Sequence, residues 1–144
     1  MSEYRDRPEP LPSDRSVLVI GLNGWVIGID RATGQKRWET SIRGSAEVYL
    51  AIGFGVVAAS AWGGVLHVLD YLTGRILWER PTKSPGRATI VIEPDQIVCA
   101  KAGYVDCYSP DGRLLWQQTL SGKGEGRTSI GYPGNVAQAD ERGG

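Results

Sequence analysis

The sequence predicts an all-β protein, and three observations support this prediction. The 144 residues include 20 glycines and five tryptophans but one Phe and one Met, a composition that favours short strands joined by many turns. Apolar residues alternate with polar ones, or run together over five or six positions, as they do in half-buried and buried strands. The whole pattern recurs about every 40 residues, which predicts a repeated β-unit.

Each repeat contains the same features in the same order: an apolar run, a turn with Gly, an alternating strand, a second turn with Gly, and a Trp. The closing tryptophans are 40 and 38 residues apart, and the glycines of the first turn are 40 and 39 residues apart. These residues are Trp38, Trp78 and Trp116, and Gly24, Gly64 and Gly103. In the first two repeats Asp30 and Asp70 open the second turn, where an Asp side chain can bond nearby backbone groups.

The repeats predict twelve strands. The expected ranges are 17–21, 25–30 and 36–42; 47–52, 56–61, 65–70 and 75–80; 88–93, 96–101, 104–109 and 113–119; and 127–136. The first repeat lacks the strand that precedes the other two, and 127–136 has the length and β-branched content to supply it as an innermost strand. We therefore expect three four-stranded β-propeller blades over residues 17–136, between flexible tails at 1–16 and 137–144.

Three blades are too few to close a ring, because propellers usually have about four to eight blades. A three-bladed monomer would also leave open sheet edges, which invite aggregation. Two copies would supply six blades. We therefore expect half of a six-bladed β-propeller, completed by homodimerisation, in which the C-terminal strand of one chain completes the first blade of the other. A trimer, or a partner chain that supplies the remaining blades, stays an alternative.

Two segments carry a family resemblance. DRATGQKRW at 30–38 and DYLTGRILW at 70–78 resemble the tryptophan-docking repeat of quinoprotein-type β-propellers, those with PQQ-like repeats, and SPDGRLLW at 109–116 is similar to a shortened form. In this family each Trp packs against the neighbouring blade near its Gly-containing turn. The resemblance therefore implies structural docking roles for Trp38, Trp78, Trp116, Gly24, Gly64 and Gly103.

The resemblance does not imply enzyme activity. Quinone enzymes of this fold need a cofactor pocket, usually with a bound Ca²⁺ and often with adjacent cysteines, whereas this chain has no adjacent cysteine pair and lacks the length of an eight-bladed enzyme. We expect no catalytic residue, no cofactor and no metal. His67 has Ile27 and Asp106 as counterparts in the other repeats, so packing is favoured over metal binding, which needs several donors. Cys99 and Cys107 are expected to be buried thiols, with a redox role left open.

Basic residues gather in one set of loops. The segments 43–46, 81–87 and 120–126 join successive blades and lie on one face of a propeller together with the hairpin loops inside the blades. The candidate partner-binding residues in these loops are Arg43, Trp62, Lys83, Arg87, Lys101, Lys123 and Arg127. Because the net charge of the chain is zero, such a face could attract an acidic protein without a strong overall field. The alternative is that these are ordinary solvated loops.

The sequence thus favours a non-catalytic scaffold or protein-interaction module. A small-ligand or glycan-binding propeller that uses Trp62 and Tyr132 is the alternative, and a fragment of a quinone-dependent enzyme is less favoured. We expect no nucleic acid, because no aromatic stacking platform lies among the charges. The sequence has no apolar N-terminal stretch and no run of about 18 apolar residues, so we also expect a cytoplasmic protein with no membrane partner.

Overall fold

The computed structural model describes residues 14–44, 46–83 and 86–139, and this part of the chain folds into strands joined by turns. The first sheet contains β1 (Val17–Leu22), β2 (Trp25–Asp30) and β3 (Lys36–Ser41). The second contains β4 (Tyr49–Gly53), β5 (Val56–Ser60), β6 (Val65–Asp70) and β7 (Ile76–Pro81). The third contains β8 (Thr89–Ile92), β9 (Ile97–Lys101), β10 (Tyr104–Tyr108) and β11 (Leu114–Thr119). A hairpin of β12 (Ile130–Tyr132) and β13 (Asn135–Ala137) follows.

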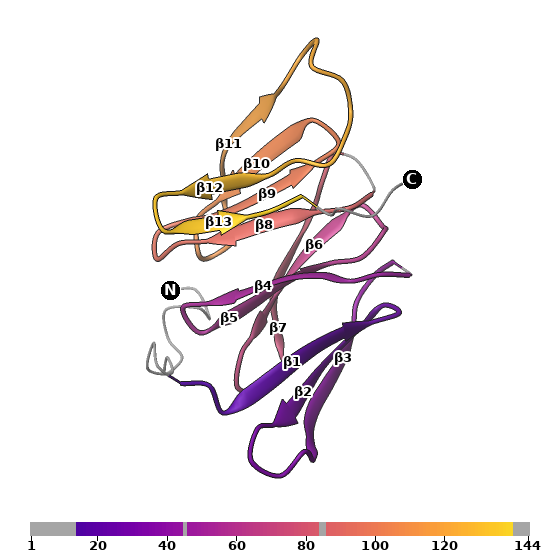
Figure 1. Ribbon diagram of the computed structural model, residues 1–144, viewed down its shortest axis with the longest axis vertical. Coiled ribbons are helices and arrows are strands. Elements are labelled where there is room, and N and C mark those ends of the chain that lie inside the picture. The colour runs from indigo at the N-terminus through magenta and orange to yellow at the C-terminus, as the bar shows by residue number, and fades with distance from the viewer. Residues whose placement is uncertain (1–13, 45, 84–85, 140–144) are drawn as a thin grey trace.

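The three sheets are antiparallel meanders that stack on one another in chain order (Figure 1). The prediction of an all-β chain is confirmed, and the first eleven predicted strands begin and end within two residues of the observed ones. The first sheet has three strands, whereas the second and third have four. Strand β1 therefore forms an edge of its sheet, where β5 and β9 each have a further strand beside them.

The second turn of each repeat is built by its own side chains. The Asp30 carboxylate accepts hydrogen bonds from the backbone N–H groups of Ala32 (2.9 Å) and Thr33 (3.0 Å). The Asp70 carboxylate accepts from both the N–H (3.0 Å) and the hydroxyl (2.9 Å) of Thr73. This confirms that Asp30 and Asp70 are turn residues, and it fixes the position of each turn relative to the strand that follows.

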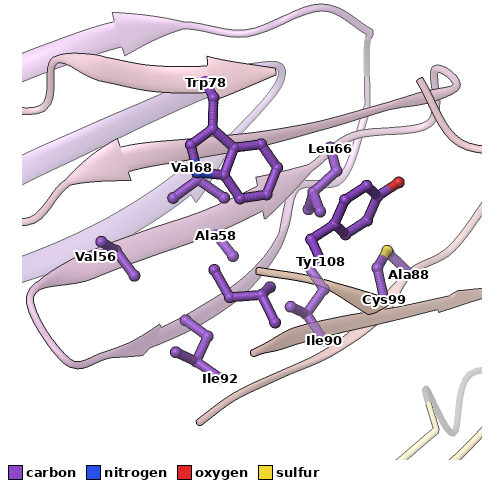
Figure 2. Packing of buried hydrophobic residues seen from close by; sticks show 11 residues of the cluster. Val56, Ala58, Leu66, Val68, Trp78, Ala88, Ile90, Ile92, Cys99 and Tyr108 are labelled. Atoms are coloured by element: carbon purple, nitrogen blue, oxygen red, sulfur yellow. The ribbon is translucent and has the colours of Figure 1, made fainter. Parts of the chain in front are cut away.

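The core lies between the sheets. Between the second and third sheets, Trp78, Val68 and Ala58 face Ile90 and Tyr108, and the rings of Trp78 and Tyr108 are 5.5 Å apart (Figure 2). A second cluster joins the first and second sheets. The second sheet is thus covered on both faces, which explains why all five residues of β5 are buried and show no alternation.

The C-terminal segment differs from the prediction. Residues 127–136 do not form one strand, because Pro133 and Gly134 (φ 80°) turn the chain after β12 and return it as β13. The hairpin contacts β8 of its own third sheet, where the Asn135 side-chain amide donates to the Ile92 carbonyl (2.9 Å). The expected C-terminal tail, 137–144, begins inside β13, and residues 1–13 and 140–144 of the expected tails lie outside the described part.

Candidate interaction surface

Two tryptophans dock onto the turn of the following sheet. The Trp38 Nε1–H donates to the Tyr71 carbonyl (3.2 Å), and the Trp78 Nε1–H donates to the Pro110 carbonyl (2.9 Å). Each of these two tryptophans is 8% exposed. A docked indole buries a large apolar area and still satisfies its polar N–H group, so these contacts hold the stack of sheets together.

The turn residue beneath each docked ring is a glycine. A Cβ atom on Gly74 would lie 2.3 Å from Cε3 of Trp38, and one on Gly112 would lie 2.7 Å from Cδ2 of Trp78. Both glycines have positive φ, 74° and 92°. Glycine is therefore required at these two positions both by the backbone and by the approach of the ring.

The glycines expected in this role lie at the opposite end of the sheets. Gly24, Gly64 and Gly103 sit in the turns β1–β2, β5–β6 and β9–β10, away from the tryptophan rings. Their carbonyl oxygens accept hydrogen bonds from the loops that leave the sheets, from the N–H groups of Ile42 (2.9 Å), Thr82 (2.8 Å) and Leu120 (2.9 Å), respectively. These glycines therefore fix the loops that carry the basic residues and do not receive the rings.

A second donor accompanies each docked ring, two residues further along the strand. The Thr40 hydroxyl donates to the Gly74 carbonyl (2.6 Å), and the Arg80 Nε–H donates to the Gly112 carbonyl (2.7 Å). The Arg80 guanidinium also lies 5.6 Å from the Trp78 ring centroid, within range of a cation–π contact. Each interface between sheets therefore uses the same pair of positions, the Trp and the residue two places after it.

Trp116 is placed differently from the other two docking tryptophans. It is 46% exposed, and every residue of its strand β11 is exposed. No turn within residues 14–44, 46–83 and 86–139 covers its ring, because the third sheet is followed by the short hairpin. The docking role expected for Trp116 is therefore not realised within the described part of the chain.

The first sheet has an open face of its own. Leu18 (58% exposed), Ile20 (38%), Leu22 (55%) and Trp25 (42%) lie on the face that points away from the second sheet. Beside the edge of β1 lies an open hollow of about 650 Å³, whose walls include Leu18 and the turn between β4 and β5. Exposed apolar patches of this kind mark interaction sites.

Three basic side chains are exposed on the loops that leave the sheets. Arg43, Lys83 and Lys123 follow β3, β7 and β11, respectively, and each is exposed. Arg87 and Arg127 are half-buried at the bases of these loops. These positions place basic residues at one end of all three sheets.

The remaining candidate residues differ in exposure and in position. Trp62 is 50% exposed in the β5–β6 loop at the same end. Lys101 is only 2% exposed, because its ammonium group donates to the Gly63 carbonyl (2.9 Å) between the second and third sheets. Lys101 therefore does not belong to the exposed face. Tyr132 contacts Gln96 through its hydroxyl at the other end of the third sheet, so it does not form one aromatic site with Trp62.

His67 supports the first basic loop, a role that the sequence alone did not reveal. The Arg43 backbone N–H donates to His67 Nε2 (3.2 Å), and His67 Nδ1 lies 2.7 Å from Oε2 of Glu79. Nδ1 therefore carries the proton, and Nε2 accepts. Burial lowers the pKa of His67 below its usual value of 6.5, although Glu79 acts in the opposite direction. The cross-strand pairing of His67 with Glu79 is the signal that could have predicted the contact between these two side chains.

The two cysteines lie on adjacent strands but point to opposite faces of the third sheet. Cys107 is paired with Val98, and Cys99 is paired with Asp106, so their side chains alternate. Both thiols are free and buried, and burial raises the pKa of Cys99 to about 12. Such a thiol is protonated at neutral pH and is a poor nucleophile.

Within the described ranges, no three His, Cys, Asp or Glu residues cluster closely enough to hold a metal ion. The same ranges contain no helix with the length and apolar character that a membrane crossing needs.

Comparison with known proteins identifies relatives of this arrangement. The family model described as outer membrane protein assembly factor BamB matches residues 5–143. The BamB protein of Yersinia pestis is 29% identical over 133 residues, covering 80% of this chain and 32% of the relative. The BamB protein of Burkholderia pseudomallei (strain K96243) is 28% identical over 134 residues, covering 79% and 35%. The chain thus spans about a third of the length of these relatives.

Solved structures share the fold. BamB from Moraxella catarrhalis superimposes with a TM-score of 0.60 at 23% identity, over 72% of this chain and 33% of that one. A computationally designed protein, Ika8, gives a TM-score of 0.72 at 21% identity, over 88% and 41%. A europium-containing methanol dehydrogenase gives 0.62 at 15% identity, over 74% and 23%. At these identities the likeness shows a β-propeller fold and carries no activity.

The expected cytoplasmic location is wrong. The matching family and both relatives are described as outer membrane protein assembly factors. The expectation rested on the lack of an apolar N-terminal stretch and of a run of about 18 apolar residues, and neither observation determines the compartment.

Proposed function

The chain belongs to the family described as outer membrane protein assembly factor BamB, and on this premise we propose that it is a non-catalytic β-propeller scaffold that binds a protein partner. The observation that carries this proposal is the set of three exposed basic side chains, Arg43, Lys83 and Lys123, on loops at one end of the sheets. The partner is a component of outer membrane protein assembly, the process for which the relatives are named.

The first residues of the basic loops are bonded in place before any partner arrives. The backbone N–H groups that begin these loops donate to the carbonyl oxygens of Gly24, Gly64 and Gly103, and the Arg43 N–H donates to His67. Segments that are already bonded in place lose less conformational entropy on binding. Exposed Lys and Arg side chains on such loops favour a partner with acidic residues, because charge complementarity speeds association and excludes wrong partners.

We also propose that two copies form the propeller ring, with three blades from each copy. The first sheet lacks a fourth strand, and both end faces of the stack carry exposed apolar side chains such as Leu18 and Trp116. A second copy would cover these faces and give six blades, a usual number for a propeller. The basic loops of the two copies would then encircle one end of the ring.

A charge-reversal experiment tests the binding surface. Lys83→Glu and Lys123→Glu are compared with the wild type in affinity capture from an envelope extract, with quantification of captured proteins by mass spectrometry. The control is Arg113→Glu, an exposed residue at the opposite end of β11. We expect a set of proteins that the wild type and the control both capture and that the two loop variants lose by at least about tenfold, the effect of about 1.4 kcal/mol. Equal capture by all four proteins would refute the proposed surface.

A further inference from the structure

The two end faces of the stack carry the two halves of one interface that already occurs twice inside the chain. Trp38 and Trp78 each occupy the turn of the following sheet, and each is 8% exposed. Trp116 has the equivalent position on β11 and is 46% exposed. The described residues thus contain three docking tryptophans and two occupied turns.

The turn left without a ring is that of the first sheet, residues 30–34. It has the same construction as the occupied turns, with Asp30 bonded to the backbone of Thr33 and with Gly34 at φ 76° beside 74° for Gly74. A Cβ atom on Gly34 would meet nothing within 4 Å, whereas one on Gly74 would collide with Trp38. The turn therefore has the shape of a docking site without its ring.

The contacts within the two internal interfaces predict which atoms Trp116 and its neighbour would use. In both, the indole N–H donates to the carbonyl of the residue that follows the first turn position, Tyr71 or Pro110. In both, the residue two places after the Trp donates to the carbonyl of the turn glycine. In the third repeat these donors are Trp116 and Gln118, which is also exposed and carries an amide NH₂ group.

We propose that Trp116 of one copy docks onto the Arg31–Gly34 turn of a second copy. Its Nε1–H donates to the Arg31 carbonyl, and the Gln118 amide donates to the Gly34 carbonyl. This inference rests on the self-association proposed above and names the residues that make it. The interface is head-to-tail, since the third sheet of one copy meets the first sheet of the next, and two such interfaces close a ring of two copies.

The apolar faces around these residues fit the same arrangement. On the second sheet, Val57, Ala59 and Ala61 face the first sheet and are fully buried by it. The residues in the same register on the first sheet are Leu18, Ile20 and Leu22, which are 58%, 38% and 55% exposed. A second copy docked through Trp116 would bury these side chains, which supplies the apolar core that a stable interface needs.

A mixing experiment tests the pairing. Trp116→Ala removes the ring, and Gly34→Asn blocks the turn with a side chain that tolerates positive φ. The matched controls are Trp62→Ala, an equally exposed Trp, and Gly122→Asn, a glycine with φ 78° and no atom within 4 Å of a Cβ. Mass is measured by light scattering after gel filtration, and far-UV circular dichroism verifies that each variant is folded.

We expect the wild type and both controls to have twice the chain mass of 15.6 kDa, and each docking variant alone to have the single mass. An equimolar mixture of the two docking variants should recover the double mass, because Trp116 of the Gly34→Asn chain can still dock onto the intact turn of the Trp116→Ala chain. A contact between two copies of Trp116 would not be restored by mixing.

Three results would overturn the proposal in different ways. A wild type of single mass at all concentrations would refute both the self-association and the docking pair. A wild type of double mass that neither variant reduces would refute the docking pair and leave the self-association intact. Variants that dissociate but do not recover on mixing would refute the head-to-tail arrangement. None of these readouts depends on Lys83 or Lys123, so the proposed partner surface is tested separately.

Discussion

Replacing Trp78 by Ala should destabilise the fold far more than replacing Trp116 by Ala. Trp78 is 8% exposed, donates to the Pro110 carbonyl and lies against Tyr108 and Arg80. A docked Trp buries about 200 Å², which at about 25 cal/mol per Å² is worth about 5 kcal/mol. This agrees with the loss of about 3–5 kcal/mol usual for buried Trp→Ala changes. Trp116 is 46% exposed and buries a little more than half of this area, so its loss should cost about 3 kcal/mol.

The measurement is urea unfolding followed by far-UV circular dichroism, at protein concentrations low enough for single chains. Since a domain of this size is stable by about 5–15 kcal/mol, Trp78→Ala could leave little folded protein. Trp78→Phe is therefore included, because it keeps a ring and loses the bond to Pro110, at a cost of about 1–2 kcal/mol. At higher concentration the cost of Trp116→Ala should rise and that of Trp78→Ala should not. Equal costs for the two Ala variants in single chains would refute the burial argument.

Two further predictions concern buried polar groups. Because burial lowers the pKa of His67 below 6.5, the unfolded chain binds more protons, so stability should be complete above about pH 6.5 and fall as the pH drops through the folded pKa. Thermal unfolding of the wild type between pH 8 and 5 should show this loss and His67→Gln should show less of it; parallel profiles would contradict the prediction. Lys101→Met removes the donor to Gly63 near the buried Asp106 and should cost about 2–3 kcal/mol in urea unfolding, against under about 0.5 kcal/mol for the exposed control Lys83→Met. Unchanged stability of Lys101→Met would show that its ammonium group is not held between the sheets.

The strands were predictable because the sequence repeats, so that equivalent segments of different repeats can be compared with one another. An ambiguous run such as β5, which is buried throughout, is identified as a strand by the turn glycine that follows it, Gly64, which recurs as Gly24 and Gly103 in the other repeats. The turns at Asp30 and Asp70 were predictable because their chemistry is local. Local signals of this kind do not depend on which surface a sheet meets.

The candidate site was less predictable because exposure depends on the neighbouring sheet. Trp116 has the same local sequence context as Trp78, and only the absence of a following turn in the described residues makes it exposed. Lys101 resembles a surface residue, yet its counterparts Leu22 and Ala61 are apolar, a sign of a buried position. The prediction of a single strand over 127–136 relied on the β-branched content of the segment and gave too little weight to Pro133 and Gly134. These two residues form a turn that splits the segment into two short strands.

In the proposed ring, the C-terminal hairpin would have to open before the edge strand of a second copy could pair with β12. Across its two-residue turn β12 pairs with β13 as β4 pairs with β5 across Phe54 and Gly55, so β13 takes the position beside β12 that the partner's β1 would need. A second copy must therefore displace three residues of β13 before its own edge strand can pair. Such an exchange of strands would protect a single chain from random edge-to-edge contacts, and it would make the rate of the proposed ring formation depend on the opening of one short hairpin.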